Sequence, residues 1–244
     1  MDTLNITTSK IDFSKMEPRE FIARRVAAML KPGITVNLGV GIPTMASDFL
    51  REGVWVQSEN GIIGVGKHAE PGIRKVESYC NASGEEIIPT KGACTFDVNM
   101  ALGMMRSGRV DATVLGCFEV AENGDLANWT MPGKSPGMGG AMDIICGVPN
   151  VIIATRHCNK NGDPKIVKSC SYPLTGVGVV NTIITEYCVM EIRDKHLVLT
   201  ELRDDITVEE LQKITGAPFE VAKDCKEMTI PVPQIVNLYQ DVSS

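Results

Sequence analysis

Short apolar runs alternate with segments of helical periodicity over most of the chain. Residues 34–38, 112–116 and 151–154 are rich in β-branched and other apolar side chains, as buried strands are. Between such runs, apolar residues recur at helical spacing in residues 17–31 and 97–108. Repeated units of strand and helix place their strands side by side in one direction, with the helices covering the sheet. The sequence therefore predicts an α/β fold with an open, mostly parallel sheet and helices on both faces.

The carboxyl-terminal half adds shorter elements. Residues 182–184, 188–192 and 196–200 resemble strands joined by short turns, which predicts a small antiparallel patch. Thr207 and Glu210 have the spacing of a capping box, so we expect a helix to begin there.

The chain of 244 residues contains no internal repeat, linker or low-complexity tract. We therefore expect one domain over residues 16–244, preceded by a polar, loosely held arm over residues 1–15. The formal net charge is −6, and Lys and Arg are scattered along the chain, so nothing indicates a nucleic-acid surface. No apolar run approaches the roughly 20 residues of a membrane span, and the amino terminus lacks a signal-peptide pattern. We expect a cytoplasmic protein with neither nucleic acid nor membrane as a partner.

Cysteine and histidine spacing argues against a metal site. The eight cysteines contain no C-x-x-C pair and mostly lie in or beside apolar runs, which indicates reduced thiols packed in a core. His68, His157 and His196 are the three histidines, and none has a ligand-type spacing to another His or Cys. No Ser or Cys lies in a nucleophile elbow, so an acyl-enzyme triad is not supported.

The turn at residues 58–61 presents a carboxylate. It separates the apolar runs 54–56 and 62–65, so the four residues are expected to join two strands at one end of a sheet. Asn60 and Gly61 form a dipeptide that favours turns with positive φ. By itself this turn fits either a solvated glutamate or a carboxylate held in one direction.

Two glycine-rich stretches are candidate ligand loops. Residues 39–43 precede a short helix expected at 44–50, but Pro43 and the missing third glycine weaken a dinucleotide-binding interpretation. Residues 119–140 form an expected long loop, and loops of that length in compact domains are usually functional. It ends in glycines before a helix predicted from Ala141, where backbone N–H groups can bind an oxyanion or a phosphate. A flexible hinge is the alternative.

Taken together, these residues resemble the β subunit of family I coenzyme A transferases, which act on 3-oxoacids and short-chain fatty acids. The resemblance is carried by residues 37–44, 58–64, 124–129, 137–143 and 173–176. It implies the open parallel sheet that these enzymes share with sugar-phosphate isomerases of the ribose-5-phosphate type.

The resemblance implies a reaction and its residues. Glu59 resembles the family's nucleophile, which attacks the thioester carbonyl of an acyl-CoA and passes through an acyl anhydride to a glutamyl-CoA thioester. Gly140 resembles the backbone donor to the oxyanion. The implied substrates are acyl-CoA and a carboxylic acid in a ping-pong exchange, with no tightly bound cofactor. A glutamate with an ordinary pKa of about 4.3 would be ionised at neutral pH without a general base.

Further residues are implied to bind substrate or CoA. Asn128 and Trp129 resemble the wall of the acyl pocket, and Asn60 and Gly61 hold the backbone of the nucleophile. The neighbours of the oxyanion donor, Gly139 and Ala141, are the remaining binding residues that we predict.

One departure from the family pattern concerns the binding of CoA. Many family members have a lysine where this chain reads Asn81-Ala82-Ser83-Gly84, so the resemblance implies that one cationic contact to the CoA phosphates is either absent or moved to Lys91 or Lys134.

The glycine block typical of the family's α half is absent, which implies a separate α subunit in a heterodimer that pairs to α2β2 or larger. Two alternatives remain open, a sugar-phosphate isomerase on the same fold and a non-catalytic CoA-binding subunit. The acids also remain open among butyrate with acetoacetate, acetate, succinate with an oxoacid, and 3-oxoadipate.

Overall fold

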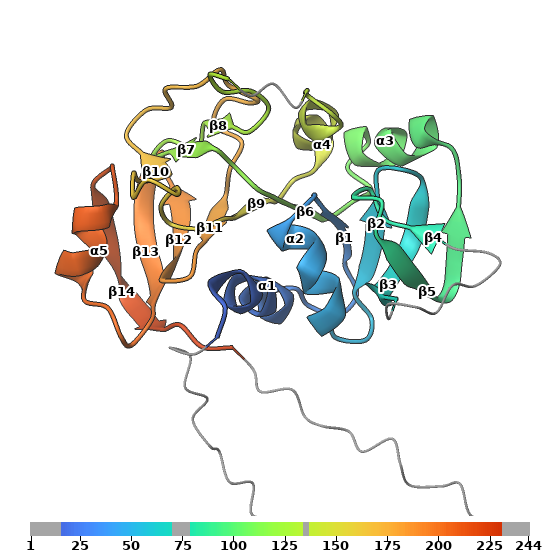
Figure 1. The fold of residues 1–244 in the computed structure, drawn as a ribbon, viewed down its shortest axis with the longest axis horizontal. Helices are drawn as coiled ribbons and strands as arrows, with labels where there is room; N and C mark the ends of the chain where they lie inside the picture. The colour runs from blue at the N-terminus through green and yellow to red at the C-terminus, as the bar shows by residue number, and fades with distance from the viewer. Residues whose placement is uncertain (1–15, 70–78, 134–136, 231–244) are drawn as a thin grey trace, which may run out of the picture.

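The computed structural model describes residues 16–69, 79–133 and 137–230 (Figure 1). The arm expected at residues 1–15 lies outside this part of the chain, so that boundary of the domain stays a prediction.

An eleven-stranded sheet dominates the described residues (Figure 1). In spatial order its strands are β14 (Phe219–Glu227), β13 (His196–Leu202), β12 (Cys188–Arg193), β11 (Thr182–Ile184), β9 (Val151–Ala154), β6 (Ala112–Leu115), β1 (Thr35–Leu38), β2 (Trp55–Ser58), β3 (Ile62–His68), β5 (Glu86–Thr95) and β4 (Tyr79–Cys80). The five central strands from β11 to β2 are parallel to their neighbours. The predicted α/β fold with a parallel sheet is therefore confirmed.

Antiparallel strands flank this parallel centre. The patch expected near residues 182–200 is confirmed, because β12 pairs antiparallel with both β11 and β13. On the opposite flank, β3 pairs antiparallel with β2 and β5, and β4 pairs antiparallel with β5. The sequence did not indicate β5, a largely exposed strand whose apolar residues do not alternate.

Five α-helices and one 3₁₀ helix accompany the strands in the described residues. They are α1 (Pro18–Met29), α2 (Ile42–Met45), the 3₁₀ helix η2 (Ala46–Phe49), α3 (Val98–Arg106), α4 (Ala141–Gly147) and α5 (Val208–Ile214). The capping box predicted at Thr207 and Glu210 is complete, and Asp97 caps α3 by accepting from the Met100 N–H. The helix expected to start at Thr44 begins at Ile42, because Pro43 fits the first turn, where its missing N–H removes no hydrogen bond.

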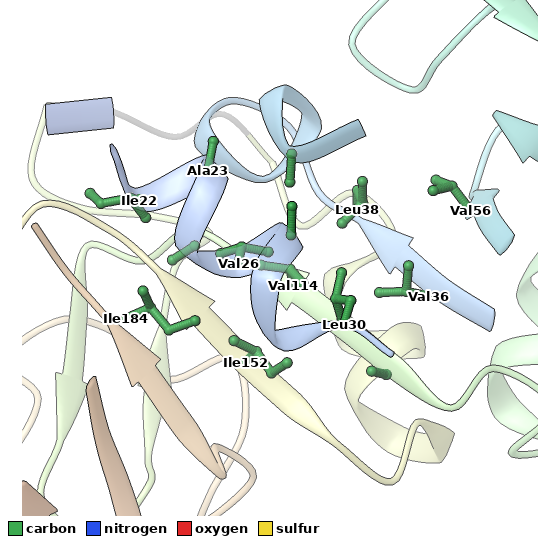
Figure 2. Packing of buried hydrophobic residues seen from close by; sticks show 14 of the residues in the cluster. Ile22, Ala23, Val26, Leu30, Val36, Leu38, Val56, Val114, Ile152 and Ile184 are labelled. Carbon is green, nitrogen blue, oxygen red and sulfur yellow. The ribbon is translucent and has the colours of Figure 1, made fainter. Parts of the chain in front are cut away.

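Helices cover both faces of the central strands. In Figure 1, α1 and α2 lie on one side and α3 and α4 on the other. Figure 2 shows Ile22 and Val26 of α1 against Val114 and Ile152 of the sheet, and all four side chains are buried. On the other face, α3 and α4 bury Met105 and Ile144 together. Removing this apolar surface from water is the main stabilising contribution to such a core.

A second sheet corrects the expectation of one long loop at residues 119–140. Within that range, β7 (Glu119–Ala121) and β8 (Leu126–Ala127) form an antiparallel pair. A third strand, β10 (Ile166–Val167), pairs parallel with β7. Val120, Leu126 and Ile166 are fully buried in a core shared with β9 and the strands beyond it, so this small sheet packs on the large one.

The cysteines divide between core and surface. All eight are free, and Cys117 and Cys188 are buried as predicted. Cys80, Cys94 and Cys146 are exposed, so the prediction of packed thiols is wrong for these three.

The strand order reverses beside β1. The chain passes from β1 to β2 on one side, while β6 lies on the other. In open α/β sheets, a crevice forms where the order reverses, outside the carboxyl ends of the strands. The segments that follow β1, β2 and β6 therefore meet at one edge of the sheet, and residues 58–61 are among them.

Candidate active site

The turn after β2 is held in a conformation that only glycine permits. Gly61 has a φ of +104°, and a Cβ atom on it would lie 2.0 Å from the carbonyl oxygen of Phe96. The Gly61 N–H donates to the Ser58 carbonyl at 3.0 Å, and the Phe96 N–H donates to the Gly61 carbonyl at 2.9 Å. Real Cβ atoms do not approach a carbonyl so closely, so a side chain at this position would displace the turn. The backbone of Glu59 is thus fixed between β2 and the end of β5.

Glu59 faces the glycine loop across the crevice. A Cβ atom on Gly140 would lie 2.5 Å from Oε2 of Glu59 and 3.0 Å from its carboxyl carbon. The absence of a side chain at Gly140 therefore allows the carboxylate to lie against the main chain. Two segments 81 positions apart in sequence come together here, as the candidate nucleophile and oxyanion donor require.

The glycine loop brings this main chain to the crevice. Gly137 and Gly139 have positive φ angles of 93° and 52°, and Gly140 is the N-cap of α4. The Gly140 carbonyl accepts the first helical bond from the Ile144 N–H at 2.9 Å. Among the described residues, no partner occupies the Gly140 N–H, which leaves it available as a donor.

Burial perturbs the Glu59 carboxylate. The side chain is half-buried, and within the described residues it makes no hydrogen bond or ion pair. Desolvation raises the pKa of Glu59 above its ordinary value of 4.5. The expectation that Glu59 has an ordinary pKa is therefore wrong, because its pKa is raised. Raising the pKa of a carboxylate makes it more basic and more nucleophilic when ionised.

Two cavities adjoin Glu59 and Gly140. The larger, of about 500 Å³, is lined by Gly39, Val40, Glu59, Ala82, Leu115, Gly116, Cys117, Phe118, Asn128, Gly137, Met138, Gly139, Gly140, Ala141 and Ile144. The smaller, of about 340 Å³, is lined by Glu59, Asn60, Ala82, Val98, Leu102, Gly139 and Gly140. A reacting group at Glu59 thus has space on two sides.

Of the predicted binding residues, Gly139 lines both cavities, Asn128 and Ala141 line the larger one, and Asn60 lines the smaller one. Gly61 lines neither cavity, because it lies in the turn between Ser58 and Phe96, to which its backbone is hydrogen-bonded. Trp129 also lies outside both cavities and donates from Nε1 to the Leu174 carbonyl at 3.2 Å.

The side chain of Asn128 is held in place by two hydrogen bonds. Its Nδ2 donates to the Gly116 carbonyl at 3.2 Å, and its Oδ1 accepts from the Thr175 hydroxyl at 2.6 Å. The strand β8 ends just before Asn128, and Trp129 follows in a bend. Beyond the strand the two side chains part, because Asn128 bonds to Gly116 and Thr175 at the cavity and Trp129 bonds to Leu174.

Other lining residues had not been identified from the sequence. Cys117, Phe118 and Ile144 gave no local signal, because apolar residues after a strand or in a helix normally indicate core. Ala82 was visible only as part of the stretch that departs from the family pattern. The bend after β1 both packs on a neighbouring strand and lines a cavity. A Cβ on Gly39 would lie 2.9 Å from Leu115, whereas Val40 is exposed and lines the larger cavity.

The candidate cations are not found beside Glu59. Lys91 lines a separate cavity together with Trp55 and Lys67, and Lys134 lies outside the described residues. Over the described ranges, no group of three side chains has the composition and proximity to hold a metal ion.

His157 is fully buried, with its ring nitrogens beside the hydroxyls of Thr185 and Thr215. Burial lowers its pKa to about 4.

None of the helices over the described residues has the length and apolar content of a membrane span.

Comparison with known proteins supports the fold. The structure of an acyl-CoA transferase apoenzyme from Escherichia coli O157:H7 is similar in fold, with a TM-score of 0.70 at 18% identity. The match covers 87% of this chain and 43% of that one, so the chain spans less than half of that enzyme. The chain therefore has the fold of a coenzyme A transferase.

Sequence comparison gives the family. A model of the coenzyme A transferase family matches residues 19–213. A probable coenzyme A transferase subunit beta of Bacillus subtilis (strain 168) is 41% identical over 206 residues, which cover 83% of this chain and 94% of that protein. The acetate CoA-transferase subunit beta of Escherichia coli (strain K12) is 43% identical over 212 residues, with coverages of 86% and 96%. The chain belongs to the coenzyme A transferase family, and the resemblance inferred from the motifs is confirmed.

Proposed function

We propose that this chain is the β subunit of a CoA-transferase that moves CoA between a short-chain acyl-CoA and a carboxylic acid. The observation that carries the proposal is the approach of the Glu59 carboxylate to Gly140 at the mouth of two cavities. Family membership and relatives named as beta subunits support it.

Glu59 acts as the nucleophile. Its carboxylate oxygen attacks the thioester carbonyl, the C–S bond breaks, and an acyl-glutamyl anhydride and CoA thiolate form. The thiolate then attacks the glutamyl carbonyl, releasing the first acid and leaving a glutamyl-CoA thioester. An acceptor carboxylate attacks that thioester and forms a second anhydride, from which the thiolate takes the new acyl group. The energy of the thioester is kept through the exchange, and Glu59 returns as a carboxylate.

Each attack passes through a tetrahedral oxyanion. The N–H of Gly140 is the proposed donor to it, because Gly140 lies beside the carboxylate and its N–H has no partner within the described residues. A donor already in position stabilises the developing charge without reorganisation in the transition state.

The larger cavity is the proposed acyl pocket. Leu115, Cys117 and Ile144 give it a buried apolar wall, and Asn128 adds one fixed amide. These groups fit a short aliphatic or 3-oxo chain of the kind in butyrate, acetate or acetoacetate. Relatives named as acetate, 3-oxoadipate and succinyl-CoA:3-ketoacid transferases leave the acid among these classes.

An α subunit is the proposed partner, in a heterodimer that pairs to α2β2 or larger in the cytoplasm. Its support is the beta-subunit naming of the relatives, together with a crevice that stays open on the described chain. The partner is expected to complete the binding of CoA, for which the described lining of the two cavities supplies no cation.

The test uses the complex of both subunits. After incubation with butyryl-CoA and then hydroxylamine, mass spectrometry of peptides is expected to find a hydroxamate on Glu59. Glu59→Gln is expected to abolish both the label and acyl exchange. Glu220→Gln is the matched control, since Glu220 is an exposed glutamate on the edge strand β14.

Label on another residue, or full exchange by Glu59→Gln, would overturn the assignment. Full exchange without label would favour a non-catalytic role for this chain. Isomerisation of ribose 5-phosphate by the isolated chain would favour the isomerase alternative.

A further inference from the structure

The residue before the nucleophile makes a buried contact with a remote loop. Ser58 ends β2 and is only 3% exposed. Its Oγ accepts a hydrogen bond from the backbone N–H of Ala82 at 3.0 Å, although the two residues are 24 positions apart. Ala82 is partly buried, and this bond to a buried hydroxyl ties the chain near Ala82 to the end of β2.

The loop that contains Ala82 is closed by its own hydrogen bonds. Oδ1 of Asn81 accepts from the N–H groups of Ser83 and Glu85 at 2.9 and 3.1 Å. Nδ2 of Asn81 donates to the Glu85 carboxylate at 2.8 Å, and the Asn81 N–H donates to the Glu85 carbonyl at 3.0 Å. These bonds tie residues 81–85 to one another, so the bond from Ala82 to Ser58 connects the whole turn to β2.

A second bond ties the same segment to the other neighbour of the nucleophile. Nδ2 of Asn60 donates to the Cys80 carbonyl at 2.9 Å. The residues on both sides of Glu59 are thus connected to residues 80–82, one through a buried hydroxyl and one through an exposed amide.

Ala82 belongs to the walls of both cavities beside Glu59. Gly140 belongs to both as well, so the carboxylate lies in a space bounded by the glycine loop and by Ala82. Displacement of Ala82 would widen this space without removing any group that touches the reacting atoms.

We propose that Ser58 is a positioning residue for the transfer reaction, which holds the Ala82 wall in place and so keeps the Glu59 carboxylate against Gly140. The inference rests on the proposed nucleophilic role of Glu59. Small displacements of a reacting group cost rate because the productive geometry is lost for part of the time.

The test is a series of substitutions at Ser58 in the complex with the α subunit. Ser58→Ala removes the acceptor, and Ser58→Cys keeps its approximate volume but offers only a weak acceptor. Both are expected to slow formation of the Glu59 hydroxamate about fivefold to tenfold, as loss of one buried hydrogen bond would. KM for acyl-CoA is expected to change little. Ser58→Thr retains the hydroxyl and is expected to restore the rate.

The pH profile separates positioning from general loss of structure. Burial raises the pKa of Glu59, so a wider, wetter crevice is expected to move the acid limb of kcat/KM to lower pH in Ser58→Ala and Ser58→Cys. Ser47→Ala is the matched control, because Ser47 is also buried and its hydroxyl donates to the Thr44 carbonyl away from the crevice. It is expected to leave both rate and profile unchanged.

The outcomes distinguish the two proposals. If Ser58→Ala and Ser58→Cys match Ser47→Ala in rate and pH profile while Glu59→Gln is inactive, the positioning role is wrong and the nucleophile stands. If Ser58→Thr is as slow as Ser58→Ala, side-chain packing and not the hydroxyl matters, and the inference is also wrong. If Glu59→Gln retains exchange, the proposed function itself fails.

Discussion

Gly140 lies against the carboxylate of Glu59, so closely that a methyl group on Gly140 would fall 2.5 Å from Oε2. Gly140→Ala must therefore displace either the glycine loop or the nucleophile. We expect kcat/KM to fall about 100-fold, the size of effect that a displacement of about 1 Å can produce. Steady-state acyl exchange by the two-subunit complex measures this.

Gly103→Ala provides the comparison for that experiment. Gly103 lies within α3, and a Cβ atom there would meet nothing within 4 Å. Alanine favours a helix by up to about 1 kcal/mol over glycine, so this variant is expected to be active and at least as stable. Equal activity of the two alanine variants would contradict the close packing at Gly140.

Acid is expected to inactivate the enzyme through Glu59. Desolvation raises the pKa of this carboxyl above 4.5, and only the ionised form can attack a thioester. The value of kcat/KM should therefore fall as the pH drops through the raised pKa, with its midpoint above 4.5. A pH–rate profile with a short-chain acyl-CoA measures the midpoint. A midpoint below the ordinary value would show that the site is more solvated than the crevice indicates.

His157 is expected to make the fold sensitive to acid. Burial lowers its pKa from 6.5 to about 4, so between these values the unfolded chain binds a proton that the folded chain does not. Stability is fully present above pH 6.5 and falls toward pH 4, by up to about 3 kcal/mol at 1.36 kcal/mol for each pKa unit. Urea unfolding at several pH values measures the slope.

His157→Gln removes this proton and should flatten the dependence. His68 shows the opposite behaviour: burial opposes its charge, but hydrogen bonds from its ring to the carboxylates of Asp48 and Glu85, together with their charges, raise its pKa. Its contribution is present below pH 6.5 and is lost as the pH rises through the raised value. An unchanged slope in His157→Gln would assign the acid sensitivity to other groups.

The ion pair between Arg25 and Glu201 is expected to contribute strongly to stability. Nε and Nη2 of Arg25 contact the two carboxylate oxygens at 2.8 and 2.5 Å, and the residues are 8% and 6% exposed. Glu201→Gln leaves a buried guanidinium without its charged partner, which costs about 3–5 kcal/mol in comparable sites. Denaturant unfolding of the protein measures the loss in the free energy of unfolding.

Arg193→Ala is the control for the buried pair. Arg193 contacts Glu191 in an exposed ion pair, and such pairs typically contribute less than about 1 kcal/mol. Similar losses in the two variants would show that burial does not strengthen the Arg25 pair.

The sequence predicted the elements whose signals are local. The Thr207–Glu210 capping box marks a helix start within one turn, and the Asn60-Gly61 dipeptide marks a turn with positive φ at Gly61. By contrast, β7 becomes a strand by pairing with β10, where Val120 lies opposite Ile166. Pairing over such a separation leaves no periodic signal in a strand of three residues, so the region appeared as one loop.

The residues of the candidate site show the same difference between local and remote signals. Glu59, Gly140 and Asn128 were found because the family resemblance marked them, and the structure places all three at one cavity. Trp129 was predicted beside them and lies outside both cavities, where its Nε1 donates to the Leu174 carbonyl. Ala82 and Cys117 reach the site only through tertiary packing, which no local pattern encodes.

The crevice is lined by residues that follow three parallel strands and by a glycine loop. Neighbouring parallel strands are joined by long crossovers and not by hairpins. No early local structure can therefore bring Glu59 to Gly140. After dilution from denaturant, helical signal should recover first, because local contacts form faster than remote strand pairings. Hydroxylamine trapping at Glu59 should recover last, which would make the nucleophile a reporter of the final step of folding.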